Sequence, residues 1–427
     1  MLSKYGIKKF TFLVACVTFC LTAFAADPTA TVYNAKQCEG SLTPYPAEIS
    51  LATYPDSLIP VYVSHVGRHG SRYPASSTHT EKMRKALEEA QEAGTITQLG
   101  KELYALTSQI ISASNTRWGA LDSLGMAEQR SIASRMLKSY PEIFSNGGMV
   151  NALCSYSPRC MMSMFSFVHQ MDRMNNKLEF TTSTGRQNSY LMRPFDTDRD
   201  YISFSEEKPW SPVYDEYFSQ NCPTSALTRV LGKDFPYGNK ERQLDLAITE
   251  YYVIAGLSAM EMPNEMKKYF TADEMNSLWS CFNLRQYLQR TATTVSTVPA
   301  DIAADLVLDI VTKVDKAIEG VNPVVADLRF GHAETVMPLV SLLRLPGCYY
   351  LTNYFDTVAL HWRDFDVVPM AANVQFILFK HAKNNKWYVQ VKLNEKPVTL
   401  IPGDDRLILP WGDARRYLMN SVPLYAQ

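Results

Sequence analysis

The sequence predicts an α/β fold in which a central, mostly parallel sheet is joined to a mostly helical inserted cap. Strand-like apolar runs alternate with helical patterns near both ends of the chain, and this alternation indicates strands linked by helices. Between them, residues 177–300 hold few strand signals and several polar, aromatic helical stretches. With 427 residues and 46% hydrophobic content, the chain can form one large domain or two. We expect residues 26–176 and 301–427 to form a discontinuous α/β domain, with 177–300 as the cap.

Residues 1–25 have the pattern of a secretory signal peptide. Three lysines and no acidic residue precede the apolar run 10-FTFLVACVTFCLTAFA-25, which ends in the small-x-small pattern of Ala23 and Ala25. A membrane anchor is the weaker alternative, because this run falls short of the roughly twenty residues that span a bilayer. A lipoprotein signal at Cys16 is a second alternative, weakened by the very short apolar run before it. We expect cleavage near Ala25 or Ala26 and export to a periplasm or to the medium.

The cysteine count and the charge bound the class of protein. Removing the signal peptide takes away three lysines and no acidic residue, so the formal charge moves from −1 to −4. A nucleic-acid-binding protein would be globally basic, so this class is not expected. The even number of remaining cysteines in an exported chain predicts at least two disulfides of undetermined pairing. The sequence has no CxxC motif, so a zinc site is not expected. These six are Cys38, Cys154, Cys160, Cys222, Cys281 and Cys348.

The elements expected before the cap begin with the strand-like run 60-PVYVSHV-66. A second strand is expected at 150–157, and a helix with a Met and Phe stripe at 159–176. That stripe is typical of core packing and not of a cofactor site. The remaining helical patterns of this part lie between the two strands, at 81–94, 98–112 and 124–140.

The elements expected from the cap onward return to alternation after two helical stretches, at 242–260 and 272–288. The last part then reads as a helix at 301–320, a strand at 324–331, a helix at 333–345 and a hairpin at 374–394. Ligand sites of such sheets lie at the carboxyl ends of strands. Three polar stretches fall at predicted strand ends, namely 65–74, 155–160 and 331–335.

The first of these stretches holds a histidine between two arginines, in 68-RHGSR-72. Arginine binds phosphate through two parallel charge-assisted hydrogen bonds, and two arginines beside one site predict a phosphate trap. Gly70 allows the backbone to approach a ligand closely. A histidine in that trap could attack phosphorus and form a phosphohistidine, while the arginines offset the charge on the transferring oxygens. A structural loop with surface arginines is the alternative.

The other two stretches add a second histidine, a carboxyl group and an arginine. In 331-GHAET-335, His332 could donate a hydrogen bond to the phosphoryl group and Glu334 could protonate a leaving oxygen. Such an acid needs a pKa above the usual value of about 4.3 to stay protonated near neutral pH. Arg159 starts a helix and would supply a third phosphate contact. The alternative for Glu334 is a favourable charge at a helix N-terminus.

These motifs together resemble a known family. Arg68 to Pro74 resembles the RHGxRxP signature of the histidine acid phosphatases, a branch of the superfamily that also holds the phosphoglycerate mutases. The stretch 121-LDSLGMAEQR-130 and the helix of Arg159 and Ser163 resemble further family segments. Most relatives carry His-Asp downstream, whereas His332-Ala333-Glu334 resembles the multiple inositol polyphosphate phosphatases. The resemblance covers about 40 to 420 and implies a phosphoglycerate-mutase-like α/β sandwich.

The resemblance also implies roles for single residues. It makes His69 the nucleophile, Glu334 the proton donor and His332 a further phosphate contact. It makes Arg68, Arg72 and Arg159 the phosphate ligands, with no metal and no organic cofactor. The histidines at 65, 79, 169, 361 and 381 match no catalytic position of the family and are expected to be structural or at the surface.

The expected function is therefore that of an exported phosphomonoesterase acting on inositol polyphosphates, with inositol hexakisphosphate (phytate) as the expected small-molecule substrate. A ligand with six phosphates needs cations beyond the motif, and Arg186 and Arg193 are candidates, although a solvated loop or an ion pair is an alternative for both. A broad-specificity acid phosphatase and a non-catalytic phosphate-binding protein are the competing functions. A mutase fits poorly with export. No nucleic acid or membrane partner is expected for the mature chain.

Overall fold

The computed structural model describes residues 32–320 and 323–424, and the described residues from 33 onward form one compact unit. The predicted signal peptide and Cys16 lie outside the described residues. Within the described part, no helix combines the length and the apolar character needed to cross a membrane.

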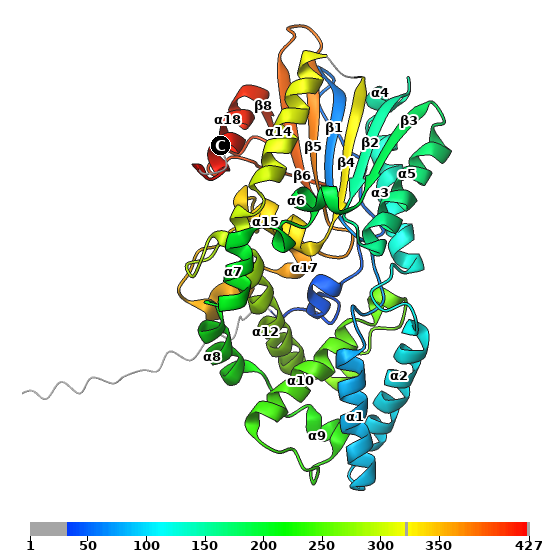
Figure 1. The fold of residues 1–427 in the computed structure, drawn as a ribbon, viewed down its shortest axis with the longest axis vertical. Helices are drawn as coiled ribbons and strands as arrows, with labels where there is room; N and C mark the ends of the chain where they lie inside the picture. The colour runs from blue at the N-terminus through cyan, green and yellow to red at the C-terminus, as the bar shows by residue number, and fades with distance from the viewer. Residues whose placement is uncertain (1–31, 321–322, 425–427) are drawn as a thin grey trace, which may run out of the picture. The chain divides into compact units, whose positions relative to one another are not determined.

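An eight-stranded sheet forms the centre of this unit, in the order β3-β2-β4-β1-β5-β6-β7, with β8 paired to β6 (Figure 1). The first four strands of this order run parallel, and the others join by antiparallel pairing. The predicted α/β fold is confirmed, and the predicted hairpin is strands β5 and β6. The strands are β1 (Leu58–Arg68), β2 (Gly148–Cys154), β3 (Leu178–Thr184), β4 (Val324–Gly331), β5 (Asn373–His381), β6 (Trp387–Leu393), β7 (Lys396–Val398) and β8 (Ile408–Pro410).

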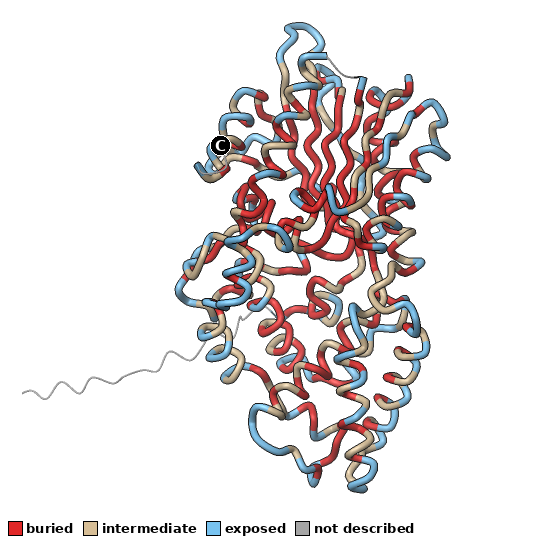
Figure 2. The backbone as a smooth tube through the Cα atoms, viewed as in Figure 1, coloured by how far each residue is buried: buried red, intermediate tan, exposed pale blue. Residues whose placement is uncertain are grey.

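Helices cover both faces of the sheet, and most residues of the central strands are buried (Figure 2). Alternate residues of one strand point to opposite faces. On β1, Val66 packs in a core with α14 (Ala304–Glu319), α15 (Ala333–Leu342) and α18 (Trp411–Ser421). Val63 packs in a second core with α3 (Ser123–Ser139) and α5 (Pro158–Met174). The strand is apolar on both faces because each face is covered by helices.

A third apolar core is helical. It is formed by α1 (Thr78–Glu92), α2 (Gln98–Ser114), α9 (Leu227–Leu231), α10 (Lys240–Ala255) and α12 (Ala272–Arg290). Two of these helices, α1 and α2, come from the part of the chain that the sequence analysis assigned to the α/β domain. The division of the chain into two domains stays a prediction. The other helices are α4 (Pro141–Phe144), α6 (Ser189–Met192), α7 (Arg199–Glu207), α8 (Ser211–Asn221), α11 (Met266–Tyr269), α13 (Val298–Asp301), α16 (Val358–His361) and α17 (Asp364–Val367).

Two sequence-based expectations differ from the structure. Residues 178–184, expected at the start of the helical cap, form β3 at the edge of the sheet. This strand, LEFTTST, lacks the apolar run of a central strand because much of it is exposed. The six cysteines named above are free and buried, so the structure does not show the disulfides that the sequence predicts. They are distributed over three separate cores, where a thiol packs as a small hydrophobic group.

Candidate active site

The three polar stretches meet at the carboxyl ends of β1, β2 and β4. In the parallel pairing of β1 with β4, Arg68 lies opposite Gly331, so the two histidine motifs are neighbours. The backbone N–H of Ser155, just past β2, donates to Phe330 of β4 (3.0 Å). Beside these strand ends lies a cavity of about 430 Å³ that is lined by both motifs and by α12. The sequence-based placement of the three stretches at one edge of the sheet agrees with this geometry.

His69 is held at the cavity wall by its backbone and by one ring nitrogen. Its N–H donates to the carbonyl of Gly331 (3.0 Å), and its carbonyl accepts from Ala371 (3.0 Å). The ring Nδ1 lies 2.9 Å from the carbonyl oxygen of Gly70. Because a carbonyl only accepts, Nδ1 carries the proton and Nε2 keeps its lone pair. Burial, and then Arg68 and Arg159, hold the pKa of His69 well below its usual value. The imidazole is therefore neutral and able to act as a nucleophile.

Helix α3 positions the loop that carries His69. Gly70 and Gly125 pack backbone to backbone, and a Cβ at Gly125 would lie 2.1 Å from the carbonyl oxygen of Ser71. Buried Glu128 accepts from the Ser71 N–H and hydroxyl, both at 2.7 Å. Gln129 donates to the carbonyl of Arg68 (2.9 Å). These contacts give a physical reason for glycine, glutamate and glutamine in 121-LDSLGMAEQR-130.

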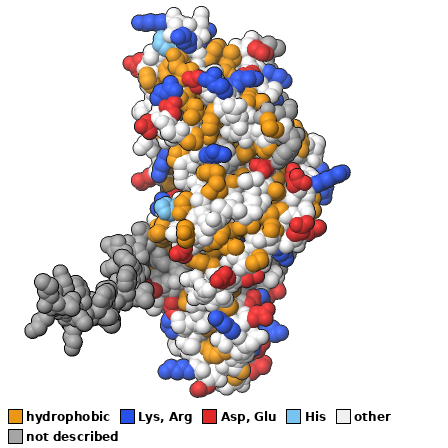
Figure 3. Space-filling model, turned by 90° about the vertical axis from the view of Figure 1, so that its left-hand side faces the viewer, with side chains coloured by type: hydrophobic (Ala, Val, Ile, Leu, Met, Phe, Trp, Pro, Cys, Tyr) orange, Lys and Arg blue, Asp and Glu red, His pale blue; other side chains and the backbone are white. Residues whose placement is uncertain are grey.

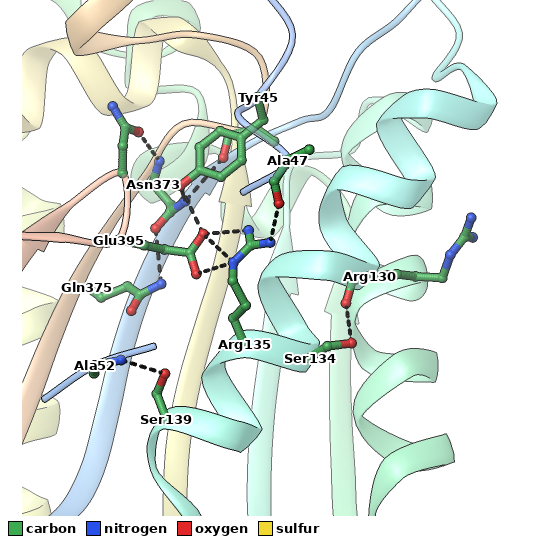
Figure 4. Close-up of polar contacts among 12 residues, drawn as sticks. Tyr45, Ala47, Ala52, Arg130, Ser134, Arg135, Ser139, Asn373, Gln375 and Glu395 are labelled. Carbon is green, nitrogen blue, oxygen red and sulfur yellow. Dashed lines mark hydrogen bonds and ion pairs between the residues drawn. The ribbon is translucent and has the colours of Figure 1, made fainter. Parts of the chain in front are cut away.

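A buried polar cluster, whose residues Tyr45, Arg135, Asn373 and Glu395 are drawn in Figure 4, is joined to Glu128 through the backbone of Tyr45. Glu128 also accepts from the N–H of Tyr45 (2.8 Å), whose hydroxyl donates to Glu395 (3.1 Å) and accepts from Asn373 (2.9 Å). Arg135 of α3 holds Glu395 in a two-pronged ion pair, with its closest contact at 2.7 Å. The cluster ties α3 to β5 and to the turn after β6, so the loop rests on a fully hydrogen-bonded support.

Three arginines of the predicted phosphate site line the cavity with unused donors. Arg68 donates through Nη1 to the carbonyls of Ser41 and Val368, both at 2.6 Å. In Arg68, Arg72 and Arg159, the buried Nε has no hydrogen-bond partner in the protein. Burial, and then repulsion by Arg159 and Arg68, lower the pKa of Arg72 to about 9. Burying unpaired cations is unfavourable, so the cluster is suited to an anion whose oxygens accept hydrogen bonds from these N–H groups.

His332 lies next to His69, with 5.7 Å between the ring centroids. It is buried among Ser155, at 2.9 Å from Nε2, and Arg159, at 3.2 Å from Nδ1. Burial lowers the pKa of His332 to about 3, and the lowering by Arg159 and Arg193 adds to that effect while Glu334 opposes it. The ring is neutral, its two nitrogens lie against Ser155, Arg159 and Arg193, and His332 is not among the residues that line the cavity, so a direct phosphate contact stays a prediction.

The two cap arginines differ in their contacts with this site. Arg193 approaches Nε2 of His332 (2.9 Å) and forms an ion pair with Asp196 (2.6 Å). Arg186 stacks on the ring of Tyr156 (4.5 Å) and is exposed. Neither is among the residues that line the cavity. Arg193 is therefore joined to the site through His332, whereas Arg186 is exposed and contacts Tyr156, and a substrate role for either stays a prediction.

Glu334 is the single acidic side chain among the described residues that line the cavity. Its Oε1 accepts from Nη2 of Arg290 (3.0 Å). Burial disfavours the charged carboxylate, but Arg290 and then His332 outweigh it and hold the pKa of Glu334 well below its usual value. Glu334 therefore lacks the raised pKa that a proton donor near neutral pH needs, because Arg290 stabilises its carboxylate. The sequence pattern did not reveal this arginine.

Sequence reasoning missed the cationic face of α12. Arg285, Gln286, Gln289 and Arg290 line the cavity, as does His79 of α1, whose ring stacks on Tyr252 at 4.3 Å. Residues one turn apart share one side of a helix, so the pairs Arg-Gln and Gln-Arg in 285-RQYLQR-290 were an available signal. They stand in an otherwise apolar helix end. No group of side chains suited to a metal ion occurs in the described part of the chain.

Comparison with known proteins identifies the family. Residues 61–394 match the family described as the histidine phosphatase superfamily (branch 2). The chain belongs to this family. It is similar to a protein named multiple inositol polyphosphate phosphatase 1 from Homo sapiens, with 25% identity over 376 residues, 80% of this chain and 75% of the relative. The protein of that name from Gallus gallus is 23% identical over 442 residues, 96% of this chain and 94% of the relative.

Two solved structures of other proteins share the fold. The Bifidobacterium longum multiple inositol polyphosphate phosphatase, crystallised with inositol hexasulfate, has a TM-score of 0.74 at 17% identity, over 91% of this chain and 99% of that chain. The phytase from D. castellii has a TM-score of 0.71 at 16% identity, over 91% of this chain and 86% of that chain. The resemblance stated from the motifs is confirmed at the level of family and fold.

Proposed function

We propose that this branch 2 histidine phosphatase hydrolyses inositol polyphosphates, phytate among them, through a phosphohistidine at His69. One observation carries the proposal: a neutral histidine and five arginines line one cavity of about 430 Å³. A cavity of that size holds a small molecule, and five cations exceed what one phosphate group needs. The relatives named above support the same substrate class.

In the first step, Nε2 of His69 attacks phosphorus and the bond from phosphorus to the ester oxygen breaks. Arg68, Arg72 and Arg159 bind the transferring oxygens through the donors that have no protein partner. The leaving alkoxide oxygen takes a proton, and Glu334 is the acid in the cavity that can give it. The products are a dephosphorylated inositol hydroxyl and phosphohistidine.

In the second step, water attacks phosphorus and the bond from phosphorus to Nε2 breaks. The carboxylate of Glu334, ionised after the first step, takes the proton of this water as the general base. Inorganic phosphate leaves, and His69 returns to its neutral form with the proton still on Nδ1. Each turnover therefore restores the protonation state with which it began.

The experiment that tests this function is phosphate release from phytate, measured against glycerol 2-phosphate and p-nitrophenyl phosphate. We expect kcat/KM to be highest on phytate, because additional phosphates can reach Arg285 and Arg290 on α12. A broad acid phosphatase would turn over the three esters with similar kcat/KM. A phosphate-binding protein would release nothing from any of them. Activity should survive a chelator, since arginines supply the positive charge at the site.

Export belongs to the same proposal. The pattern of residues 1–25 supports it, and phytate-degrading activity in the culture medium or periplasmic extract of an expressing cell would be the expected result. A chain that keeps residues 1–25 in the cytoplasm would contradict export without contradicting the catalytic proposal.

A further inference from the structure

We propose that Arg290 is a positioning residue that exchanges Glu334 for a substrate phosphate, so that substrate binding itself prepares the general acid. This inference rests on the proposed function. It concerns the pair formed by the last residue of α12 and the second residue of α15, with 3.0 Å between Nη2 of Arg290 and Oε1 of Glu334. The pair lies in the wall of the catalytic cavity.

The first argument is that the pair uses only part of the guanidinium. Nη2 contacts Glu334 and Nη1 donates to Gln289 (3.0 Å), whereas the buried Nε has no hydrogen-bond partner. An arginine fully engaged with a carboxylate donates two parallel hydrogen bonds to it. Arg290, which lines the cavity, therefore keeps an unused buried donor, as do the three arginines of the phosphate site. A phosphate group has more acceptor oxygens than Glu334 offers to Arg290 in this contact.

The second argument is the conflict between the pair and the first chemical step. The main charged or titratable groups that act on Glu334 here are cationic or neutral. They are Arg290 of α12, His332 at the start of α15, Arg68 and Arg72 of the first motif and Tyr201 of α7. In this surrounding Glu334 is a carboxylate, which suits the base of the second step but cannot protonate a leaving group.

A polyanionic substrate resolves that conflict. Its phosphates compensate the arginines, and one of them takes the donors of Arg290 away from Glu334. A nearby negative charge raises the pKa of a carboxyl group, so Glu334 then takes up one proton from solvent. The same proton passes to the ester oxygen when the bond to phosphorus breaks. Once the alcohol has left, Arg290 can return to the carboxylate and favour the base form.

Kinetics of Arg290→Gln test this exchange, with Arg285→Gln as the matched control. Arg285 lies on the same helix and lines the same cavity, but it hydrogen-bonds Tyr252. On phytate at pH 6, both variants should lose kcat/KM. On glycerol 2-phosphate, whose single phosphate occupies the His69 site, Arg290→Gln should gain about threefold to tenfold, because the acid is no longer held ionised. Arg285→Gln should not gain.

The gain must depend on Glu334. It should vanish when Arg290→Gln is combined with Glu334→Gln. A loss on both substrates in a folded Arg290→Gln enzyme would overturn the proposal, since a merely structural role predicts that result. A gain that persists without Glu334 would overturn it as well.

Proton uptake provides a second test that needs no Arg290 variant and no turnover. Inositol hexasulfate is the probe, because its sulfate groups do not titrate near pH 5. Calorimetry in two buffers of different ionisation enthalpy should show that the wild-type protein takes up more protons on binding than Glu334→Gln does. Equal uptake by both proteins would overturn the exchange. If phytate is not hydrolysed but this difference is found, the proposed function fails while the exchange stands.

Discussion

At the scale of single residues, His69 has the one feature that phosphoryl transfer to nitrogen requires. The carbonyl of Gly70 fixes the proton on Nδ1, so the lone pair of Nε2 is available without a separate base. The pKa of His69 lies well below its usual value because of burial and the neighbouring arginines. A lowered pKa of a base moves its protonation to lower pH. The nucleophile therefore stays active under mildly acidic conditions.

We predict that His69→Ala abolishes turnover, by about 10³-fold or more, without unfolding the protein. Wild-type enzyme quenched during turnover should carry an acid-labile phosphoryl group that the variant lacks. With p-nitrophenyl phosphate, the acid limb of kcat/KM, which reports the free enzyme, should lie below the usual histidine pKa of about 6.5. A phosphoenzyme formed by His69→Ala would exclude His69 as the nucleophile.

Glu334 gives the second prediction at this scale. Glu334→Gln should reduce kcat/KM on phytate by roughly 100-fold or more, the usual scale for losing a general acid. The parameter kcat/KM covers steps only through release of the alcohol, so the second step does not enter. On p-nitrophenyl phosphate the reduction should be far smaller, because that leaving group hardly needs a proton. Equal reductions on both substrates would mean that Glu334 supports the structure of the pocket instead.

At the scale of elements, α3 and β1 form one unit through the contact of Gly125 with the loop after β1. A Cβ at Gly125 would meet backbone atoms at 2.1 and 2.7 Å, and backbone cannot move away as a flexible side chain can. The helix is also held by Glu128 and by the Arg135–Glu395 pair, so it cannot retreat without breaking buried polar contacts. The position of the nucleophile thus depends on a residue that touches no substrate.

We predict that Gly125→Ala reduces stability by about 1–3 kcal/mol, the range for overpacking, and reduces kcat by about 100-fold, because a shift of about 1 Å misplaces the nucleophile. Gly412→Ala is the matched control. A Cβ at Gly412, in α18, meets no atom within 4 Å, and the helix favours alanine over glycine. The control should keep full activity and equal or higher stability. Full activity of Gly125→Ala would show that the loop adapts.

The same elements show what the sequence could and could not predict. The apolar strand β1 and the motif after it could be predicted, because the apolar strand pattern, the glycine and the two arginines are all features of neighbouring residues in the sequence. Strand β3 was not, since an edge strand with polar residues lacks the apolar run of a buried strand. The Arg290–Glu334 pair joins residues 44 apart in the chain, and such a contact depends on how α12 packs against α15. The motif therefore predicted the acid, but not its ionisation state.

At the scale of the whole molecule, the positive charge that matters is concentrated in one cavity. The formal charge of the chain is −1, and the face drawn in Figure 3 carries acidic and basic side chains interspersed. The cavity, in contrast, is lined by five arginines and one glutamate. Such a cavity attracts anions without making the surface a general polyanion binder.

The distribution of cysteines leads to a prediction about redox state. All six described cysteines are buried and free, and a hydrogen bond with Cys222, then burial, raise the pKa of Cys281 well above its usual value. A buried thiol with a raised pKa reacts slowly. We predict that thiol reagents label none of the six in the native mature protein within minutes, and all six after denaturation. Fewer than six in the denatured exported protein would indicate that disulfides form after all.

The arginine cavity also predicts a link between anion binding and the stability of the whole unit. A ligand that binds only the folded state at 100 times its Kd stabilises that state by about 2.7 kcal/mol. For a chain of this length we expect a rise in Tm of about 3–5 °C with saturating inositol hexasulfate, measured by calorimetry. The rise should be much smaller in Arg72→Ala, which loses a buried donor of the anion site. Arg416→Ala, a change at an exposed position on α18, should behave like wild type. An equal rise in Arg72→Ala would mean that the polyanion binds and stabilises the protein elsewhere, and the cavity would then not be the site at which this protein recognises phosphate.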